Sequence, residues 1–302
     1  MLAILAPGQG SQTPGMLEAW LENPSLKDLL SNFSDAIDLD LERLGTVADA
    51  DEIKDTSHAQ PLIVAASLLS SKALGEDIHF SFVAGHSVGE IAAAAVAGVI
   101  TDIDAMKLVR LRGLEMAKAA ALSPAGMSAV LGGERAVVLD AIRELDLVAA
   151  NDNGAGQIVA AGSLESLAAL APIGARVRAL AVAGAFHTSY MQPAVEPLRT
   201  MAATLGVQPP SVGVISNQEG AVITDGRDVL DRIVNQIANP VRWDLCMETL
   251  RAQGVTGVIE LAPGGTLTGL IKRAVPEIEQ CALKTPADIE QAQEFAARHG
   301  KV

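Results

Sequence analysis

Aromatic residues and cysteine are both scarce in this chain. Aromatic side chains make up 3% of its 302 residues, and the only two cysteines, Cys246 and Cys281, lie far apart in sequence. This spacing is typical neither of a zinc site nor of a disulfide framework, and it favours a reducing compartment. No basic segment precedes the first apolar residues, so we predict no signal peptide. The longest apolar run, around Ile91–Ile100, is too short to span a bilayer. We therefore expect a cytoplasmic protein with no metal site and no membrane contact.

Basic residues are also in deficit. Twenty-two Lys and Arg face 36 Asp and Glu, which gives a formal net charge of −14. Nucleic-acid binding depends on neutralising phosphates with basic side chains, so we exclude it. An acidic protein partner would have to dock on a local basic patch. Hydrophobic residues reach 49%, so Ala, Val and Leu fill the core, which suits helices packed on a parallel sheet in one large domain or two.

The sequence around Ser87 carries the most specific chemical signal. An apolar, β-compatible segment precedes it and a run of strong helix formers follows it. Between them, residues 85–89 read Gly-His-Ser-Val-Gly and fit G-x-S-x-G, the nucleophile elbow. A strand that turns sharply into a helix strains the central residue and exposes its hydroxyl beside the N–H groups of the helix. We predict that Ser87 is a nucleophile. The alternative is a glycine-rich turn whose serine only caps the helix.

Arg112 is the second informative residue. A helix is expected over Ala105–Ala121, with a cap in Thr101–Asp104. At about 100° per residue, Arg112 falls in the middle of the apolar arc of that helix. A buried guanidinium is costly unless an anion pairs with it. Either a core carboxylate pairs with Arg112, or the planar guanidinium binds a substrate carboxylate through two hydrogen bonds.

From about Gly126 the pattern changes to strand, helix, strand, strand, helix and strand, the last strand lying over Val177–Val182. This order matches the split ferredoxin-like unit. We predict an α/β fold in which a large α/β-hydrolase-like domain with a mostly parallel sheet, residues 1–124 and 188–302, contains an inserted ferredoxin-like subdomain, residues 125–187.

His187 follows the last strand of this unit. It stands at the predicted domain junction, where ligand clefts form, and about a hundred residues after Ser87. A base and a nucleophile commonly meet through the fold at such separations. We predict that His187 is the general base, although a lone histidine is more often an ordinary core or surface residue. No acid lies in an obvious triad context, so a backbone carbonyl could orient the ring.

Two further segments contribute less. The loop Pro7–Gln12 follows a predicted strand over Leu2–Ala6, but Thr13 replaces the third glycine of a dinucleotide fingerprint and no Walker lysine follows. We therefore do not predict nucleotide binding, and note that such a loop can present a backbone N–H to a site. A helix is expected to begin around Ala59–Pro61, with Pro61 near its first turn.

Six motifs in sequence resemble the malonyl-CoA:acyl carrier protein transacylases. They are Gly8-Gln9-Gly10-Ser11-Gln12, Gly85-His86-Ser87-Val88-Gly89-Glu90, Arg112-Gly113, Gly184-Ala185-Phe186-His187, Gln236 with Asn239-Pro240-Val241-Arg242-Trp243, and Pro263-Gly264. The resemblance runs from Leu2 to about Leu283. Val88 replaces a more usual leucine, and the residues before His187 resemble those of malonyl-selective members.

The resemblance implies a role for each matching residue. Ser87 would accept malonyl from coenzyme A, with His187 as its base, and Arg112 would pair with the malonyl carboxylate. The backbone N–H groups of Gln9 and Val88 would form an oxyanion hole. The carbonyl of Gln236 would orient His187, and Gln60 and Asn153 would line the cleft. The implied partners are malonyl-CoA, whose thioester is a substrate and not a bound cofactor, and acyl carrier protein, in fatty acid or polyketide synthesis.

Two other functions remain compatible with the elbow motif. A serine hydrolase or thioesterase would use the same serine with water as the acceptor. A non-catalytic module that binds acyl-CoA or carrier protein would need no activated nucleophile. For an acidic carrier protein, we predict a basic patch made of Arg176, Arg178, Lys272 and Arg273 at the mouth of the cleft.

Overall fold

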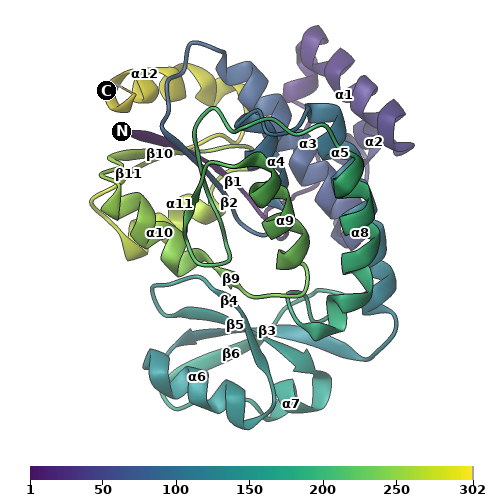
Figure 1. Cartoon of the computed structure of the whole chain (residues 1–302), viewed down its shortest axis with the longest axis vertical. Coiled ribbons are helices and arrows are strands. Elements are labelled where there is room, and N and C mark those ends of the chain that lie inside the picture. Colours follow the sequence, from purple (N-terminus) through teal and green to yellow (C-terminus); the bar gives the residue numbers. More distant parts are fainter. Residues whose placement is uncertain (301–302) are drawn as a thin grey trace.

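The computed structural model describes residues 1–300 and has a mixed α/β architecture with two sheets. Figure 1 shows the larger sheet and its helices above the smaller sheet. The larger sheet has the strand order β11-β10-β1-β2-β7-β8, parallel except for β8. Its strands are β1 (Leu2–Ala6), β2 (Phe82–Gly85), β7 (Gly213–Ile215), β8 (Val222–Ile223), β10 (Gly257–Glu260) and β11 (Glu279–Ala282).

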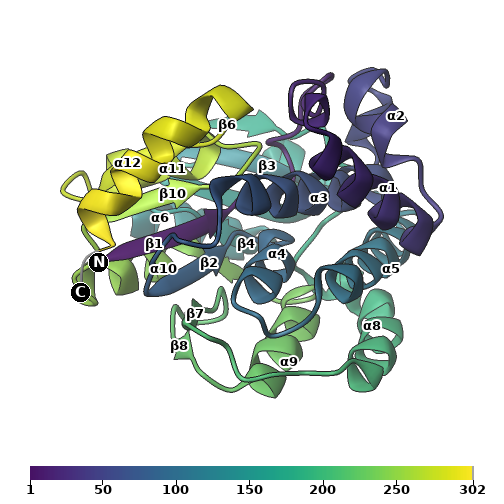
Figure 2. The ribbon, with the colours of Figure 1, turned by 90° about the horizontal axis from the view of Figure 1, so that it is seen from above.

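Helices cover both faces of the larger sheet. Every residue of β1 is buried, and successive side chains point to opposite faces. Leu2 and Ile4 pack with α3 (Thr56–Leu74), α4 (Gly89–Val96), α5 (Asp102–Ala120) and α12 (Ile289–His299). Ala3 and Leu5 pack with α10 (Trp243–Ala252) and α11 (Thr266–Ala274). Figure 2 shows α3 and α12 on one side of β1 and α10 on the other.

Four more helices pack in the same layer as α3, α4, α5 and α12. They are α1 (Pro24–Ile37), α2 (Leu41–Thr46), α8 (Gln192–Thr204) and α9 (Gly226–Gln236), and α8 packs along α5. Within residues 1–300, no helix is both long and apolar enough to cross a membrane.

The smaller sheet follows the predicted order of elements. In chain order these are β3 (Ala125–Gly132), α6 (Arg135–Glu144), β4 (Val148–Asp152), β5 (Gln157–Ser163), α7 (Leu164–Ala169) and β6 (Ala175–Ala179). The sheet has the order β6-β3-β5-β4-β9, and α6 and α7 bury one of its faces. The last strand was expected over Val177–Val182, but it ends at Ala179, after which the chain turns toward the larger layer.

A short strand from the last third of the chain completes the smaller sheet. Strand β9 (Val241–Arg242) pairs in parallel with β4, Asn151 against Val241 and Asp152 against Arg242. An ion-pair chain reinforces the connection: Arg135 binds Asp152 at 2.6 Å and lies 3.8 Å from Asp244, which Arg242 binds at 2.7 Å. The two sheets are therefore joined through β9 as well as through the segments that flank β3 and β6.

The predicted start of α3 is wrong. The helix begins at Thr56, and the Asp55 side chain caps it by accepting from the backbone N–H of Ser57. Pro61 lies inside the helix, where its missing N–H leaves the Ser57 carbonyl without its usual partner. The Arg110 guanidinium of α5 donates to that carbonyl at 2.9 Å. A contact from a distant helix thus compensates for the internal proline, which the local sequence could not reveal.

Candidate active site

Ser87 occupies the sharp turn between β2 and α4. Its φ of 54° lies in the left-handed region, which a non-glycine residue rarely adopts. A Cβ on Gly85 would overlap the backbone of Gly89, and a Cβ on Gly89 would overlap the Ala6 carbonyl. Only glycine fits at these two positions, so the strand, the turn and the helix can pack closely enough to project the serine hydroxyl.

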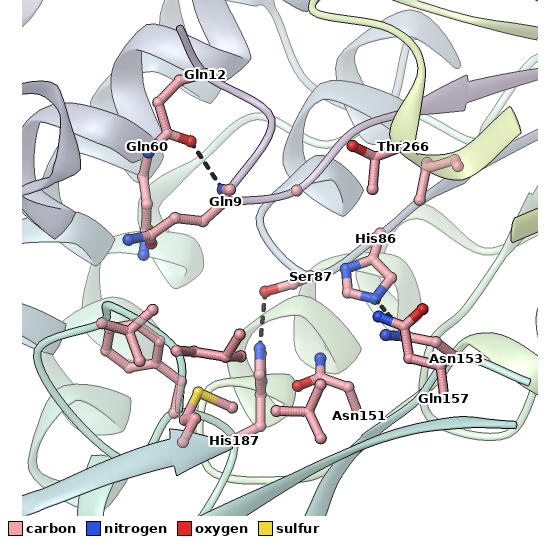
Figure 3. A pocket seen from close by; sticks show the side chains of 18 of the residues that line it. Gln9, Gln12, Gln60, His86, Ser87, Asn151, Asn153, Gln157, His187 and Thr266 are labelled. Carbon is pink, nitrogen blue, oxygen red and sulfur yellow. Dashed lines mark hydrogen bonds between the residues drawn. The ribbon is translucent and has the colours of Figure 1, made fainter. Parts of the chain in front are cut away.

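His187 faces Ser87 from the opposite side, as Figure 3 shows. The serine Oγ lies 2.7 Å from the imidazole Nε2, and the imidazole Nδ1 lies 2.8 Å from the main-chain carbonyl oxygen of Gln236. Because that oxygen can only accept, Nδ1 carries the proton and Nε2 is free to accept from the serine hydroxyl. Burial, reinforced by the Arg112 charge, lowers the pKa of His187 to about 3. The ring is therefore neutral at pH 7, as a base must be.

Arg112 lies beside the serine in the buried middle of α5. Only 1% of its surface is exposed. Nη1 donates to Gln60 Oε1 at 2.7 Å, and Nη2 donates to Gln236 Oε1 at 3.0 Å and to Ser87 Oγ at 3.4 Å. Nε has no hydrogen-bond partner within residues 1–300. Burial lowers the pKa of Arg112 to about 10, so the side chain remains a cation at neutral pH, and it is held by amides instead of a directly paired carboxylate.

Glu90 and Asn217 belong to the site, although sequence reasoning missed both. Glu90 is 3% exposed on α4, and its Oε1 accepts from the Asn217 backbone N–H at 2.6 Å. Its Oε2 accepts from the side-chain amide of Gln236. Asn217 Oδ1 accepts from the Ser87 backbone N–H at 2.8 Å. The one available signal was a carboxylate within the otherwise apolar helix Gly89–Val96.

Two backbone N–H groups in segments next to Ser87 have no backbone hydrogen-bond acceptor among residues 1–300. Gln9 lies in the loop after β1, and Val88 is the residue before the first turn of α4. Within residues 1–300, neither main-chain N–H makes a backbone hydrogen bond. The N-terminus of α4 adds the positive end of its helix dipole. These groups can stabilise a developing oxyanion on a carbonyl attached to Ser87.

His86 turns away from Ser87. Its Nε2 lies 2.8 Å from Asn153 Oδ1, a contact visible in Figure 3, and its ring packs edge-on against Trp243. Burial lowers the pKa of His86. The contact joins the elbow to the end of β4 and places the Asn153 amide at the cavity wall.

A cavity of about 410 Å³ lies between the two sheets. Six of the eight residues singled out from the sequence line it: Gln9, Gln60, Ser87, Arg112, Asn153 and His187. The other two, Val88 and Gln236, do not line it; Gln236 contacts His187 through its backbone carbonyl and Arg112 through its side-chain oxygen. Met127 and Val159 of the smaller sheet supply an apolar wall.

Of the four residues of the expected basic patch, only Arg273 lines the cavity. It reaches across to the smaller sheet, where its Nη2 donates to Gln157 Oε1 at 3.2 Å. Arg176 and Arg178 are exposed on β6, and Lys272 is exposed on α11. Lys54, which the sequence analysis did not single out, also lines the cavity.

Comparisons with known proteins extend over nearly the whole chain. The acyl transferase domain family matches residues 4–296. A curated malonyl CoA-acyl carrier protein transacylase from Mycobacterium tuberculosis is 52% identical over 301 residues, covering 96% of this chain and 99% of that protein. The crystal structure of MCAT from Mycobacterium tuberculosis matches with a TM-score of 0.93 and 51% identity, covering 97% of this chain and 99% of that one. A malonyl-transacylase solved in complex with its type II PKS acyl-carrier protein matches with a TM-score of 0.91 and 30% identity, covering 97% and 99%.

Proposed function

The chain belongs to the malonyl CoA-acyl carrier protein transacylases of the acyl transferase family, and from this premise we propose how its residues perform the transfer. The enzyme moves a malonyl group from malonyl-CoA to the phosphopantetheine thiol of acyl carrier protein. The observation that carries the residue assignment is the position of Ser87 Oγ, 2.7 Å from a neutral imidazole and 3.4 Å from a buried guanidinium with no directly paired carboxylate.

In the first half-reaction, Ser87 attacks the thioester carbonyl of malonyl-CoA. The hydroxyl proton passes to His187 Nε2 as the new C–O bond forms. The N–H groups of Gln9 and Val88 hold the oxyanion. When the C–S bond breaks, His187 returns its proton to the leaving sulfur. The products are free coenzyme A and a malonyl ester on Ser87.

In the second half-reaction, the carrier-protein thiol attacks the ester. His187 takes the thiol proton, a new C–S bond forms, and the ester C–O bond breaks. The proton then returns to Ser87. Every bond and proton is accounted for by the two thiols, the serine and the imidazole, and on this balance we propose that the reaction needs no bound cofactor.

Arg112 selects the malonyl group in this mechanism. Its unpaired Nε and the adjacent Nη2 lie on one edge of the guanidinium, where a carboxylate can accept two parallel hydrogen bonds. Gln60 accepts from Nη1 and Gln236 accepts from Nη2, so two amides hold the side chain in place. An ion pair between Arg112 and the malonyl carboxylate would orient the thioester carbonyl toward Ser87.

The architecture supports a finer assignment of the two layers. We propose an α/β-hydrolase-like large domain, residues 1–124 and 188–302, and a ferredoxin-like subdomain, residues 125–187. The elbow in the first and the β6-β3-β5-β4 order in the second support this division. Carrier protein would approach the cavity mouth beside Arg273, with Arg176, Arg178 and Lys272 extending the basic surface. The two unpaired cysteines favour a cytoplasmic location.

Intact-mass measurement tests the proposal directly. Incubation with malonyl-CoA should add one malonyl group to the wild type and none to Ser87→Ala. Addition of carrier protein should then discharge the adduct with equal formation of malonyl-carrier protein. Steady release of free malonate without carrier protein would instead indicate a hydrolase or thioesterase. Absence of any adduct would indicate a binding module.

A further inference from the structure

Two buried charges of opposite sign lie beneath Ser87 without touching. Glu90 is 3% exposed and Arg112 is 1% exposed. The side-chain amide of Gln236 lies between them: it accepts from Arg112 Nη2 at 3.0 Å and donates to Glu90 Oε2. A buried charge without a counter-charge strongly destabilises the folded state. Each charge therefore stabilises the other electrostatically, and the Gln236 amide connects them through one hydrogen bond to each.

The surrounding hydrogen bonds determine which way this amide faces. Its Nε2 group is directed at three acceptors, Glu90 Oε2, the Ser87 carbonyl at 3.1 Å and Asn217 Oδ1 at 3.2 Å. The opposite orientation would place an oxygen against these three acceptors and an NH2 group against the Arg112 guanidinium. The Gln236 oxygen therefore faces Arg112, in the orientation that a carboxylate behind it stabilises.

The other groups that face Glu90 do not replace Arg112 as its counter-charge. Arg232 of α9 is paired with Glu219 at 2.6 Å and with Asp228 at 2.9 Å. Burial raises the pKa of the Cys246 thiol on α10, so it stays neutral. His187 is neutral for the reason given above.

We propose that Glu90 is the resident counter-charge of Arg112, and that the malonyl carboxylate replaces Glu90 as the counter-charge when malonyl is bound to Ser87. The inference rests on the proposed function, since it requires a malonyl ester on Ser87. Glu90 touches no substrate in this scheme and is a positioning residue. In the free enzyme it balances Arg112, and in the malonyl enzyme the substrate takes over that role.

Malonylation should also change the number of protons that the site binds. The free site holds one cation and one anion, and malonyl adds a second anion. Protonation of Glu90 removes the excess negative charge and turns one of its oxygens into an O–H donor, while the other oxygen can still accept a hydrogen bond. Burial already raises the pKa of Glu90 to about 7, and a nearby anion raises it further. Acetyl carries no charge, so acetylation should take up no proton.

The first experiment compares the melting temperatures of free, malonylated and acetylated enzyme at about pH 8.5, for wild type and Glu90→Gln. Loss of Glu90 destabilises all three forms through the hydrogen-bond network, but it leaves Arg112 unbalanced only where malonyl is absent. We expect malonylation to raise the melting temperature of Glu90→Gln by at least about 3 °C more than that of wild type. Acetylation should shift both proteins equally, and the difference should vanish in the Arg112→Ala background.

The second experiment needs no variant. We expect the gain in melting temperature on malonylation of wild type to be larger at about pH 6 than at about pH 8.5, with no such trend for acetylation. His187 and His86 do not interfere, because burial lowers the pKa of each below its ordinary value. If malonylation raises the melting temperature by the same amount at both pH values and in both wild type and Glu90→Gln, the role of Glu90 is refuted while the proposed function stands. Failure of wild type to form the adduct would overturn the proposed function as well.

Discussion

Replacing Arg112 by Ala should slow acylation of Ser87 by malonyl-CoA while sparing or accelerating acylation by acetyl-CoA. Arg112 contacts Ser87 Oγ at 3.4 Å and presents an unpaired Nε. A hydrogen bond to a charged group contributes about 1.5–3 kcal/mol. Loss of a two-point contact, taken at the low end as about 3 kcal/mol, should therefore slow malonyl acylation about 10²-fold. Acetyl has no carboxylate to lose, and its acylation should be spared or accelerated.

The ratio of the two rates separates selectivity from structural damage. Arg112→Ala also leaves the oxygens of Gln60 and Gln236 without donors, a cost that both acyl groups share. The assay is time-resolved intact-mass detection of acyl-Ser87 with malonyl-CoA and with acetyl-CoA. Arg110→Ala is a matched control, because the one side-chain hydrogen bond of this neighbouring arginine within residues 1–300 is to the Ser57 carbonyl of α3, and its loss should affect both rates alike. Equal losses for malonyl and acetyl in Arg112→Ala would refute the assignment and leave Arg112 a structural residue.

Three other perturbations have definite expected outcomes. Burial lowers the pKa of His187 to about 3, so below about pH 6.5 the unfolded chain binds a proton at this residue that the folded protein does not bind. The free energy of unfolding should therefore fall as the pH drops from 6.5 toward 3, and urea titrations should show a smaller fall for His187→Gln. Identical pH profiles for the two proteins would mean that the imidazole is not held neutral. Gly85→Ala should lower the melting temperature and abolish acylation together, because the added Cβ meets the backbone of Gly89; a folded, active variant would show that the turn is less tightly packed than described. Arg273→Glu should slow transfer to carrier protein while leaving acylation by malonyl-CoA less affected, and unchanged carrier-protein kinetics would place the docking surface elsewhere.

The sequence predicts most reliably what depends on short spacings. Backbone packing in the tight turn requires glycine two positions before and two positions after Ser87. The elbow can therefore be recognised from five consecutive residues without a structure. Arg112 could be placed because one helix period is enough to assign it to an apolar arc. His187 could be proposed from its position at a change of pattern, but its contact with the Gln236 carbonyl came only from the family resemblance.

What the sequence could not show depends on contacts between residues far apart in the chain. Glu90 meets the backbone of Asn217 and the side chain of Gln236, and no local pattern relates them. The shifted pKa values of Glu90 and His187 follow from burial, which exists only once the chain has folded. Strand β9 is two residues long, too short for any periodicity. Its pairing with β4 is a property of the assembled fold.

That short strand couples the proposed base, His187, to the smaller sheet through the chain between residues 236 and 241. Four residues separate Val241 from Gln236, whose carbonyl sets the proton on His187. A deletion or insertion between them would shift either the pairing of β9 with β4 or the position of the Gln236 carbonyl. Such a change should abolish activity even though every side chain that lines the cavity is unchanged. Attempts to graft a foreign smaller sheet onto this scaffold should therefore carry the 236–242 segment along with it.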